Sequence, residues 1–104
     1  MYEAKVLRII EAQKFVEETV RKYGVKRSVL ASLAGVLEEL GELSSKILIS
    51  EKFKRGTIRH GEVGYCFAKV LFELLKLADA CNIDLEREWT EAIEEWRRQE
   101  PRWL

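Results

Sequence analysis

Apolar residues recur at helical spacing through most of this chain, and this periodicity constrains its fold more than any other feature. In the first segment, an apolar residue stands at every seventh position, at Tyr2, Ile9, Val16 and Tyr23. That spacing places the four on one face of a helix. The 104 residues include one Pro and six Gly, so few positions interrupt helices. The pattern predicts an all-α fold without strands.

Four helices are expected in one domain that spans residues 1–104. They are predicted at residues 2–23, from an N-cap at Ser28 to about residue 50, at about 62–81, and from an N-cap at Asp84 until Pro101 stops the last one. Gly24 is a typical stop after the first helix. The stretch 51–61, which has two glycines, is the one obvious loop. Four helices with short connections predict an up-and-down bundle.

The second and third predicted helices are apolar over about half of their circumference or more. This arc is wider than the roughly 100° of a helix that is buried on one side only. A chain of 104 residues has a limited core of its own, so the excess apolar surface predicts a homo-oligomer. A dimer or a tetramer of closed symmetry would bury it.

Charge and composition exclude several classes of protein. Eighteen basic residues balance eighteen acidic ones, which argues against a generic nucleic-acid binder. No apolar run approaches the roughly 20 residues of a membrane span. The first residues mix Glu3, Lys5 and Arg8 with apolar ones, unlike a secretory signal peptide. Cys66 and Cys81 do not make a disulfide framework, and a cytoplasmic protein is expected.

The most distinctive polar feature is a group of three acidic residues, Glu38, Glu39 and Glu42, in the second predicted helix. Their spacing places them on an arc of roughly 100° beside the apolar face. Gly35 and Gly41 lie in the same segment, where each costs about 1 kcal/mol relative to Ala. Close approach of another backbone or of a ligand is one explanation for such glycines.

Like charges at this spacing destabilise a helix unless something positive lies between them. Mg²⁺ is a candidate, because it prefers carboxylate oxygens and is often held by one or two carboxylates plus substrate phosphates. The simpler alternative is a solvated acidic face, neutralised by Lys46 or by basic residues of the loop.

The order of residues resembles a known family. The stretch LEELGELSSKI is similar to the acidic helix of the MazG-like all-α nucleoside triphosphate pyrophosphohydrolases, whose pattern is ExxE followed by ExxD on the next long helix. Glu39 and Glu42 match ExxE, and Glu38 matches a frequent extra acid. The stretches LLKLADACNIDLEREW and WRRQEPRW also resemble that family, so the similarity covers about residues 5–103.

The second half of the motif departs from the family pattern. In one register Glu62 keeps the Glu of ExxD, and Tyr65 replaces the Asp. In the other register Cys66 and Lys69 occupy the two positions, and both acids are lost. A Lys69 ammonium there could neutralise the glutamates in place of a metal ion.

The resemblance implies a Mg²⁺-dependent enzyme that cleaves a nucleoside triphosphate to a monophosphate and pyrophosphate. It implies Glu39, Glu42 and Glu62 as metal ligands, with Glu38 assisting Glu39 and Glu42 in catalysis. Three basic residues of the loop could meet phosphate oxygens, although an ordinary solvated loop explains them equally: Lys52, Lys54 and Arg55.

Two alternatives to the enzyme stay open. One is a catalytically degenerate MazG-like bundle, which keeps the fold, has lost the second metal motif and acts as a binding or assembly module. The other is an unrelated helical interaction protein.

Overall fold

The computed structural model describes residues 6–25 and 28–99. This part of the chain contains four helices and no strand: α1 (Ile9–Lys22), α2 (Val29–Ser50), α3 (Glu62–Ala80) and α4 (Leu85–Arg98). The prediction of an all-α fold with four helices is confirmed.

Helix ends follow the local signals of the sequence. Gly24 adopts a left-handed φ of 64° just after α1, a conformation that glycine takes at little cost. The Ser28 hydroxyl accepts a hydrogen bond from the Ala31 N–H at 3.2 Å and caps α2. The Asp84 carboxylate accepts one from the Arg87 N–H at 3.1 Å and caps α4. Both predicted N-caps are confirmed.

The predicted start of the first helix is wrong. Residues 6–8 are not helical, and α1 begins at Ile9. Arg8 has extended backbone angles, and its N–H donates to Glu11 Oε1 at 3.1 Å. Because Glu11 occupies the third helical position, this bond satisfies an N–H at the helix end and fixes the start there. Tyr2 and Pro101, which also entered the boundary predictions, lie outside the described residues.

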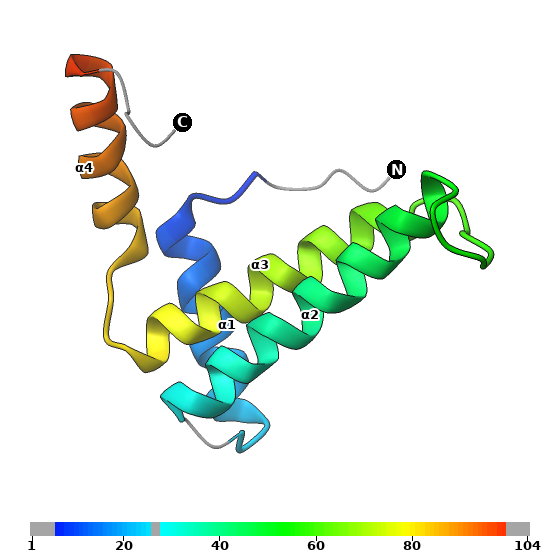
Figure 1. The fold of residues 1–104 in the computed structure, drawn as a ribbon. Helices are drawn as coiled ribbons and strands as arrows, with labels where there is room; N and C mark the ends of the chain where they lie inside the picture. The colour runs from blue at the N-terminus through cyan, green and yellow to red at the C-terminus, as the bar shows by residue number, and fades with distance from the viewer. Residues whose placement is uncertain (1–5, 26–27, 100–104) are drawn as a thin grey trace.

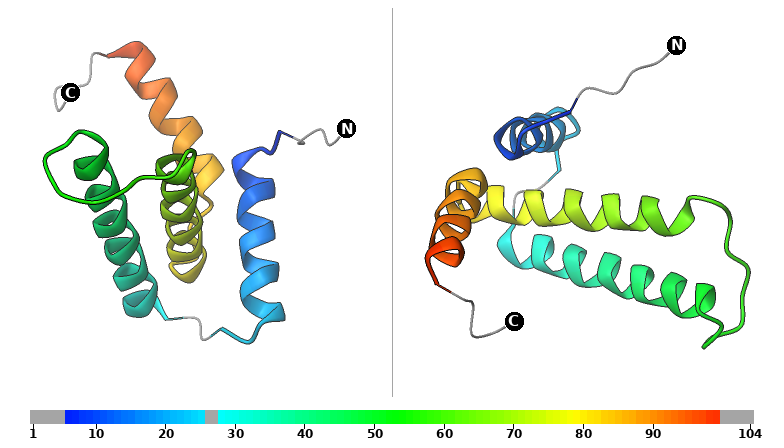
Figure 2. Two further views of the ribbon diagram at one scale, coloured as in Figure 1. Left: turned by 90° about the vertical axis from the view of Figure 1, so that its right-hand side faces the viewer. Right: turned by 90° about the horizontal axis from the view of Figure 1, so that it is seen from above.

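Helices α2 and α3 form a long antiparallel pair joined by the loop that precedes Glu62 (Figure 1). Helix α1 packs on the other flank of α3, so that the order across the molecule is α2, α3, α1 (Figure 2). Helix α4 packs mainly on α1 and extends away from the α2–α3 pair. Helix α3 is therefore the central element.

The main core lies between α1 and α3. Val16 is 1% exposed and packs with Val20 and Leu75, and partly buried residues of α1, α3 and α4 surround these three. Burying side chains of this size stabilises the fold by about 1.5–3 kcal/mol each. Between α2 and α3, Val36 and Leu43 of α2 and Cys66 of α3 are also buried.

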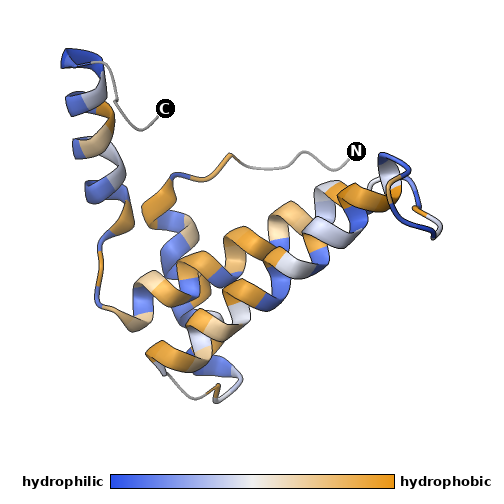
Figure 3. Cartoon of the chain, in the orientation of Figure 1, coloured by the Kyte–Doolittle hydropathy of each residue, from blue (hydrophilic) through white to orange (hydrophobic). Residues whose placement is uncertain are grey.

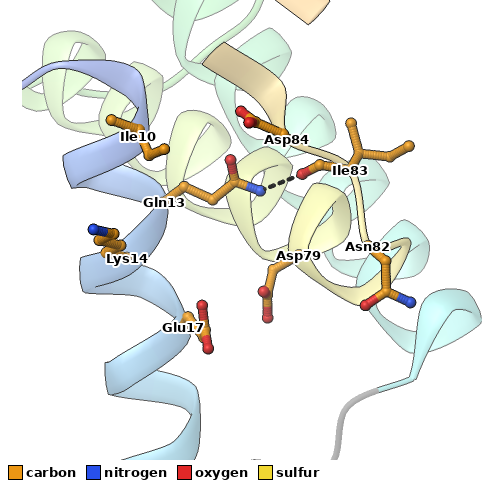
Figure 4. A pocket seen from close by; sticks show the side chains of 8 residues that line it. All are labelled: Ile10, Gln13, Lys14, Glu17, Asp79, Asn82, Ile83 and Asp84. Carbon is orange, nitrogen blue, oxygen red and sulfur yellow. Dashed lines mark hydrogen bonds between the residues drawn. The ribbon is translucent and has the colours of Figure 1, made fainter. Parts of the chain in front are cut away.

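Polar contacts attach the connection before α4 to α1. The Gln13 side chain donates to the Ile83 carbonyl at 2.6 Å (Figure 4). It also accepts from the Leu85 N–H at 3.1 Å. An Arg8–Glu86 ion pair at 2.6 Å lies beside it. No described residue of α4 is fully buried, so these contacts contribute much of what positions the helix.

One chain does not enclose its apolar surface. The radius of gyration is 16.3 Å, whereas a compact domain of this length has about 13 Å. Apolar residues line both helices of the α2–α3 pair (Figure 3). We call the following exposed residues the apolar face: Leu30, Leu33, Leu37, Leu40, Ile47 and Leu48 of α2, with Phe67, Leu71 and Leu74 of α3.

Candidate functional site on the charged face

The opposite face of the α2–α3 pair carries charged side chains from both helices. Successive residues of a helix are 100° apart around its axis. On α2, the buried positions point toward α3. The charged positions lie on one side of this contact, and the exposed apolar positions lie on the other. We define the charged face by these residues: Glu39, Glu42 and Lys46 of α2, with Glu62, Lys69 and Glu73 of α3.

Lys69 forms an ion pair that joins the two helices. Its Nζ lies 3.2 Å from Glu39 Oε2, and both side chains are largely covered, at 31% and 25% exposure. The same Nζ lies 5.6 Å from the centre of the Tyr65 ring, within the range of a cation–π contact. The contact with the Glu39 carboxylate raises the pKa of Lys69, and the charge of Glu42 adds to this effect. Lys69 therefore stays protonated beside the glutamates.

A second ion pair joins α2 to the start of α3. Lys46 Nζ lies 2.8 Å from Glu62 Oε1, and the Arg59 N–H donates to Glu62 Oε2 at 2.9 Å. The hydrogen bonds from Lys46 and from the Arg59 backbone lower the pKa of Glu62. The hydrogen bond to Glu62 raises the pKa of Lys46, and the charge of Glu42 contributes to this rise. Both oxygens of Glu62 thus have donors from this chain.

Gly35 lies against a carboxylate of α3. A Cβ built on Gly35 would lie 2.6 Å from Glu73 Oε2, closer than real Cβ contacts come. The same Glu73 oxygen lies 2.8 Å from Lys76 Nζ, one turn along α3. The sequence had suggested a backbone or a ligand close to this glycine, but a glutamate side chain occupies the space. Gly41 has no described atom within 4 Å of its built Cβ, so the chain itself does not explain this second glycine.

Glu42 borders an open pocket of about 420 Å³ beside the two ion pairs. Its lining includes Lys69 of α3 and, at the end of the loop, Arg59 and His60. Both carboxylate and cationic groups therefore face this hollow. Glu38 is exposed on the outer side of α2 and does not line it.

The predicted metal ligands do not form a metal-binding group in the structure. Within residues 6–25 and 28–99, no three His, Cys, Asp or Glu side chains are arranged to hold a metal ion. Glu39 and Glu62 each contact a lysine ammonium instead. A cation at that place competes with a protein ammonium, so this arrangement does not fit Mg²⁺.

The predicted phosphate-binding residues form a separate group. Lys52, Lys54 and Arg55 line a pocket of about 410 Å³ together with Phe53. Lys54 Nζ also donates to Ser45 Oγ at 2.7 Å, which ties the loop to α2. These three bases do not line the pocket beside Glu42. Their role with phosphate stays a prediction.

Sequence reasoning missed two polar contacts, one on the charged face and one at the α3–α4 connection. Lys46 was a candidate partner for the glutamates of its own helix, whereas its ion-pair partner is Glu62 of α3. Gln13 was not singled out, although its amide holds the α3–α4 connection. The close approach of Glu73 did have a signal in the sequence, because Gly35 lowers the stability of a helix when it lies in the middle of one.

No protein-family model, curated protein sequence or solved structure matches this chain. Among the described residues, no helix combines the length and the apolar character that crossing a membrane requires.

Proposed function

We propose that this protein is a MazG-like helical module that acts by binding and assembly rather than by Mg²⁺-dependent hydrolysis. The observation that carries the proposal is the ion pair of Lys69 with Glu39, at 3.2 Å across the two helices. In the family that the sequence resembles, a metal ion neutralises the carboxylates of the acidic helix. Here lysine ammonium groups of the same chain supply that positive charge.

The placement of Cys66 and Lys69 favours one register of the family resemblance. Cys66 is 2% exposed, and Lys69 faces the acidic residues of α2. These are the places where the Glu and the Asp of ExxD would face the first motif. In this register a buried thiol and an ammonium replace two of the four carboxylates that would attract a divalent cation.

The competing hypothesis is the pyrophosphohydrolase itself. The pocket beside Glu42 supports it, because Glu42 and basic side chains share that hollow. For this enzyme to form, Mg²⁺ would have to displace both lysines from their carboxylates. The two hypotheses therefore predict opposite responses to metal and to loss of the carboxylates.

The decisive experiment measures pyrophosphate release from a panel of nucleoside triphosphates with and without Mg²⁺. We expect no Mg²⁺-dependent release. We also expect millimolar Mg²⁺ to leave the melting temperature of the wild type unchanged, since a ligand that does not bind the folded state cannot stabilise it.

The double variant Glu39→Gln/Glu42→Gln provides the second readout. It should melt at a lower temperature than the wild type without metal, because Lys69 loses its charged partner. If Mg²⁺ drives pyrophosphate release and the double variant abolishes it, the proposal is wrong and the chain is an enzyme. A double variant that is more stable without metal would contradict the role given to Lys69.

A further inference from the structure

The loop between α2 and α3 is the most basic part of the chain. Residues 52–61 contain no acidic residue and four basic ones, Lys52, Lys54, Arg55 and Arg59, whereas the other 94 residues carry 14 basic and 18 acidic ones. The loop lies at the end of the α2–α3 pair that points away from α1 and α4 (Figure 2). A net charge of zero therefore hides one positive site on a chain that is otherwise acidic.

Backbone hydrogen bonds fix how this loop leaves α2. The Phe53 N–H donates to the Leu48 carbonyl at 2.8 Å. The Lys52 N–H donates to the Ile49 carbonyl at 3.0 Å. These two bonds form a Schellman motif, whose left-handed residue is usually Gly but here is Lys52, with a φ of 65°. A residue with a side chain loses stability in this conformation, and such costs concentrate at functional sites.

Phe53 stays in solvent, although a Schellman motif commonly packs the side chain at its position against the helix. It is 83% exposed. One exposed apolar residue is ordinary by itself. Phe53, however, stands between two lysines and lines an open hollow of about 410 Å³ together with Lys52, Lys54 and Arg55. We call this pocket the loop hollow.

Contacts with α2 hold the loop hollow in shape. Its other lining residues are Ile49 and Gly56. A Cβ built on Gly56 would lie 2.8 Å from Ile49 Cδ1, so the loop closes tightly on the helix at this point. Lys54 Nζ donates to Ser45 Oγ at 2.7 Å and ties the same part of the loop to α2. The hollow is therefore formed within the chain, as binding sites usually are.

The lining combines a flat aromatic ring with positive charge. No ion pair joins Lys52 or Arg55 to another residue that the structure describes. A bare phosphate would use the charge but not the ring, and a membrane surface is flat, whereas these groups surround a hollow. A nucleotide unit uses both, because its base stacks on the ring and its phosphate meets the ammonium and guanidinium groups.

A second exposed ring lies at the same end of the molecule. Tyr65 is 66% exposed and lines the pocket beside Glu42 together with Arg59 and His60 of the loop. Glu42 repels phosphate there, so Tyr65 is a platform for a base rather than for a phosphate. Two rings beside a basic loop fit a single strand, whose successive bases stack on such rings while cations follow its backbone. A duplex keeps its bases paired and does not offer them.

We propose that the α2–α3 loop binds single-stranded nucleic acid, with one base stacked on Phe53 and the adjoining phosphates held by Lys52 and Arg55. Stacking and phosphate contacts do not distinguish the bases, so the site tolerates changes of sequence. The loop hollow lies outside the charged face, and strand binding does not depend on the Lys69–Glu39 pair or on the absence of hydrolysis.

The test is the fluorescence anisotropy of labelled oligo(dT) and oligo(U) of about 12 nucleotides, titrated with the full chain at several salt concentrations. The wild type should bind both, and less tightly as the salt concentration rises. Phe53→Ala should raise the dissociation constant at least about fivefold, the effect of losing one stacked base. Lys52→Met and Arg55→Met should each reduce the slope of log K against log salt by about 0.7, the value for one phosphate on a single strand.

Phe15→Ala and Lys14→Met are the matched controls. Phe15 is 58% exposed on α1, and Lys14 beside it is also exposed, so these variants remove the same groups away from the loop. Both should bind the oligonucleotides like the wild type. If the controls lose as much affinity as the loop variants, net charge and exposed apolar surface hold the strand, and the proposal is wrong.

Other ligands of the same chemistry are separated in the same assay. Phe53→Leu keeps an apolar side chain but has no ring face, so it should bind oligonucleotides as weakly as Phe53→Ala. Binding of Phe53→Leu equal to that of the wild type would overturn the proposal. So would the absence of oligonucleotide binding at low salt, with or without capture of the protein by phosphatidylserine vesicles. Equally tight binding of a duplex of the same length, or displacement of the strand by an equimolar nucleoside triphosphate, would overturn it as well.

The same preparations are assayed for pyrophosphate release, so that the two proposals fail separately. A protein that binds oligonucleotides and hydrolyses nucleotides refutes the proposed absence of hydrolysis and leaves the loop site in place. A protein that does neither refutes the loop site and leaves the role of Lys69 in place.

Discussion

The two faces of the α2–α3 pair differ in how many of their side chains have partners within one chain. On the charged face, Glu39, Glu62 and Glu73 each lie within 3.2 Å of a lysine ammonium of the same chain. On the apolar face, Leu30 is 78% exposed and Leu37 is 61% exposed. Three carboxylates of the charged face thus have cationic partners within the chain, whereas the side chains of the apolar face stay exposed.

The difference has a physical reason. Long charged side chains can reach an oppositely charged group on the neighbouring helix or one turn away on their own helix. Burial of apolar side chains requires a contact surface, and the four helices in this arrangement leave the apolar face without one. The charged face is therefore partnered within the chain, and the apolar face is left open to solvent.

The largest expected effect contrasts two neighbouring leucines of α3. Leu75 is 5% exposed in the core with α1, whereas Leu74 is 42% exposed on the apolar face. Leu75→Ala should lower the free energy of unfolding by about 2–5 kcal/mol. Leu74→Ala should lower the free energy of unfolding by only about 1 kcal/mol, because less of the Leu74 side chain leaves water on folding.

Urea denaturation at one protein concentration measures both substitutions. Equal losses for the two leucines would show that the apolar face is already buried within one chain. The contrast between the two faces would then be wrong.

A smaller effect is expected from the two glycines of α2. Gly41→Ala should raise the free energy of unfolding by up to about 1 kcal/mol, because no described atom lies near and Ala favours the helix. Gly35→Ala should instead lower it by about 1 kcal/mol, since the new methyl group displaces the buried Glu73 carboxylate from its place beside Lys76.

Thermal or urea denaturation gives the sign of each change. Adding Glu73→Ala to Gly35→Ala should recover part of the loss, and a double-mutant cycle measures this coupling. If the two changes simply add, Glu73 is not what excludes a side chain at position 35. A loss of stability in Gly41→Ala would contradict the open space beside that glycine.

Much of the fold could be predicted because its signals are local. Ser28 and Asp84 cap their helices through bonds to residues three positions away, and Gly24 ends a helix by its own conformation. The start of α1 was missed although its signal is also local. The apolar periodicity runs back to Tyr2, while the bond from the Arg8 N–H to Glu11 sets the boundary at Ile9.

The candidate site could be predicted only in part. The spacing of acids along one helix placed Glu39 and Glu42 together, and one of the two registers of the family resemblance placed Lys69 near them. The Lys46–Glu62 pair depends on how α2 and α3 align across a loop, which no spacing within either helix determines. The same holds for Gln13, whose partners lie at least 70 residues away.

The smallest expected effect is the pH dependence of stability from the charged face. The pKa values of Lys46 and Lys69 are raised in the folded chain by their glutamate partners. Their contribution to stability is therefore fully present below the ordinary lysine pKa of 10.5, and it is lost as the pH rises through the raised values. The pKa of Glu62 is lowered from 4.5, so its contribution is present above pH 4.5 and is lost as the pH falls through the lowered value.

Lys46→Met should weaken the pH dependence at both ends, because Lys46 titrates at the alkaline end and also holds the pKa of Glu62 low. Melting temperatures measured from acid to alkaline pH check this, with Lys52→Met in the loop as the control for loss of one positive charge. The Lys52→Met control should shift the melting temperature slightly and by a similar amount at every pH. If both variants change the curve alike, net charge and not the Lys46–Glu62 pair sets the pH dependence. The charged face would then be a solvated surface, without the internal pairing that distinguishes it from the apolar face.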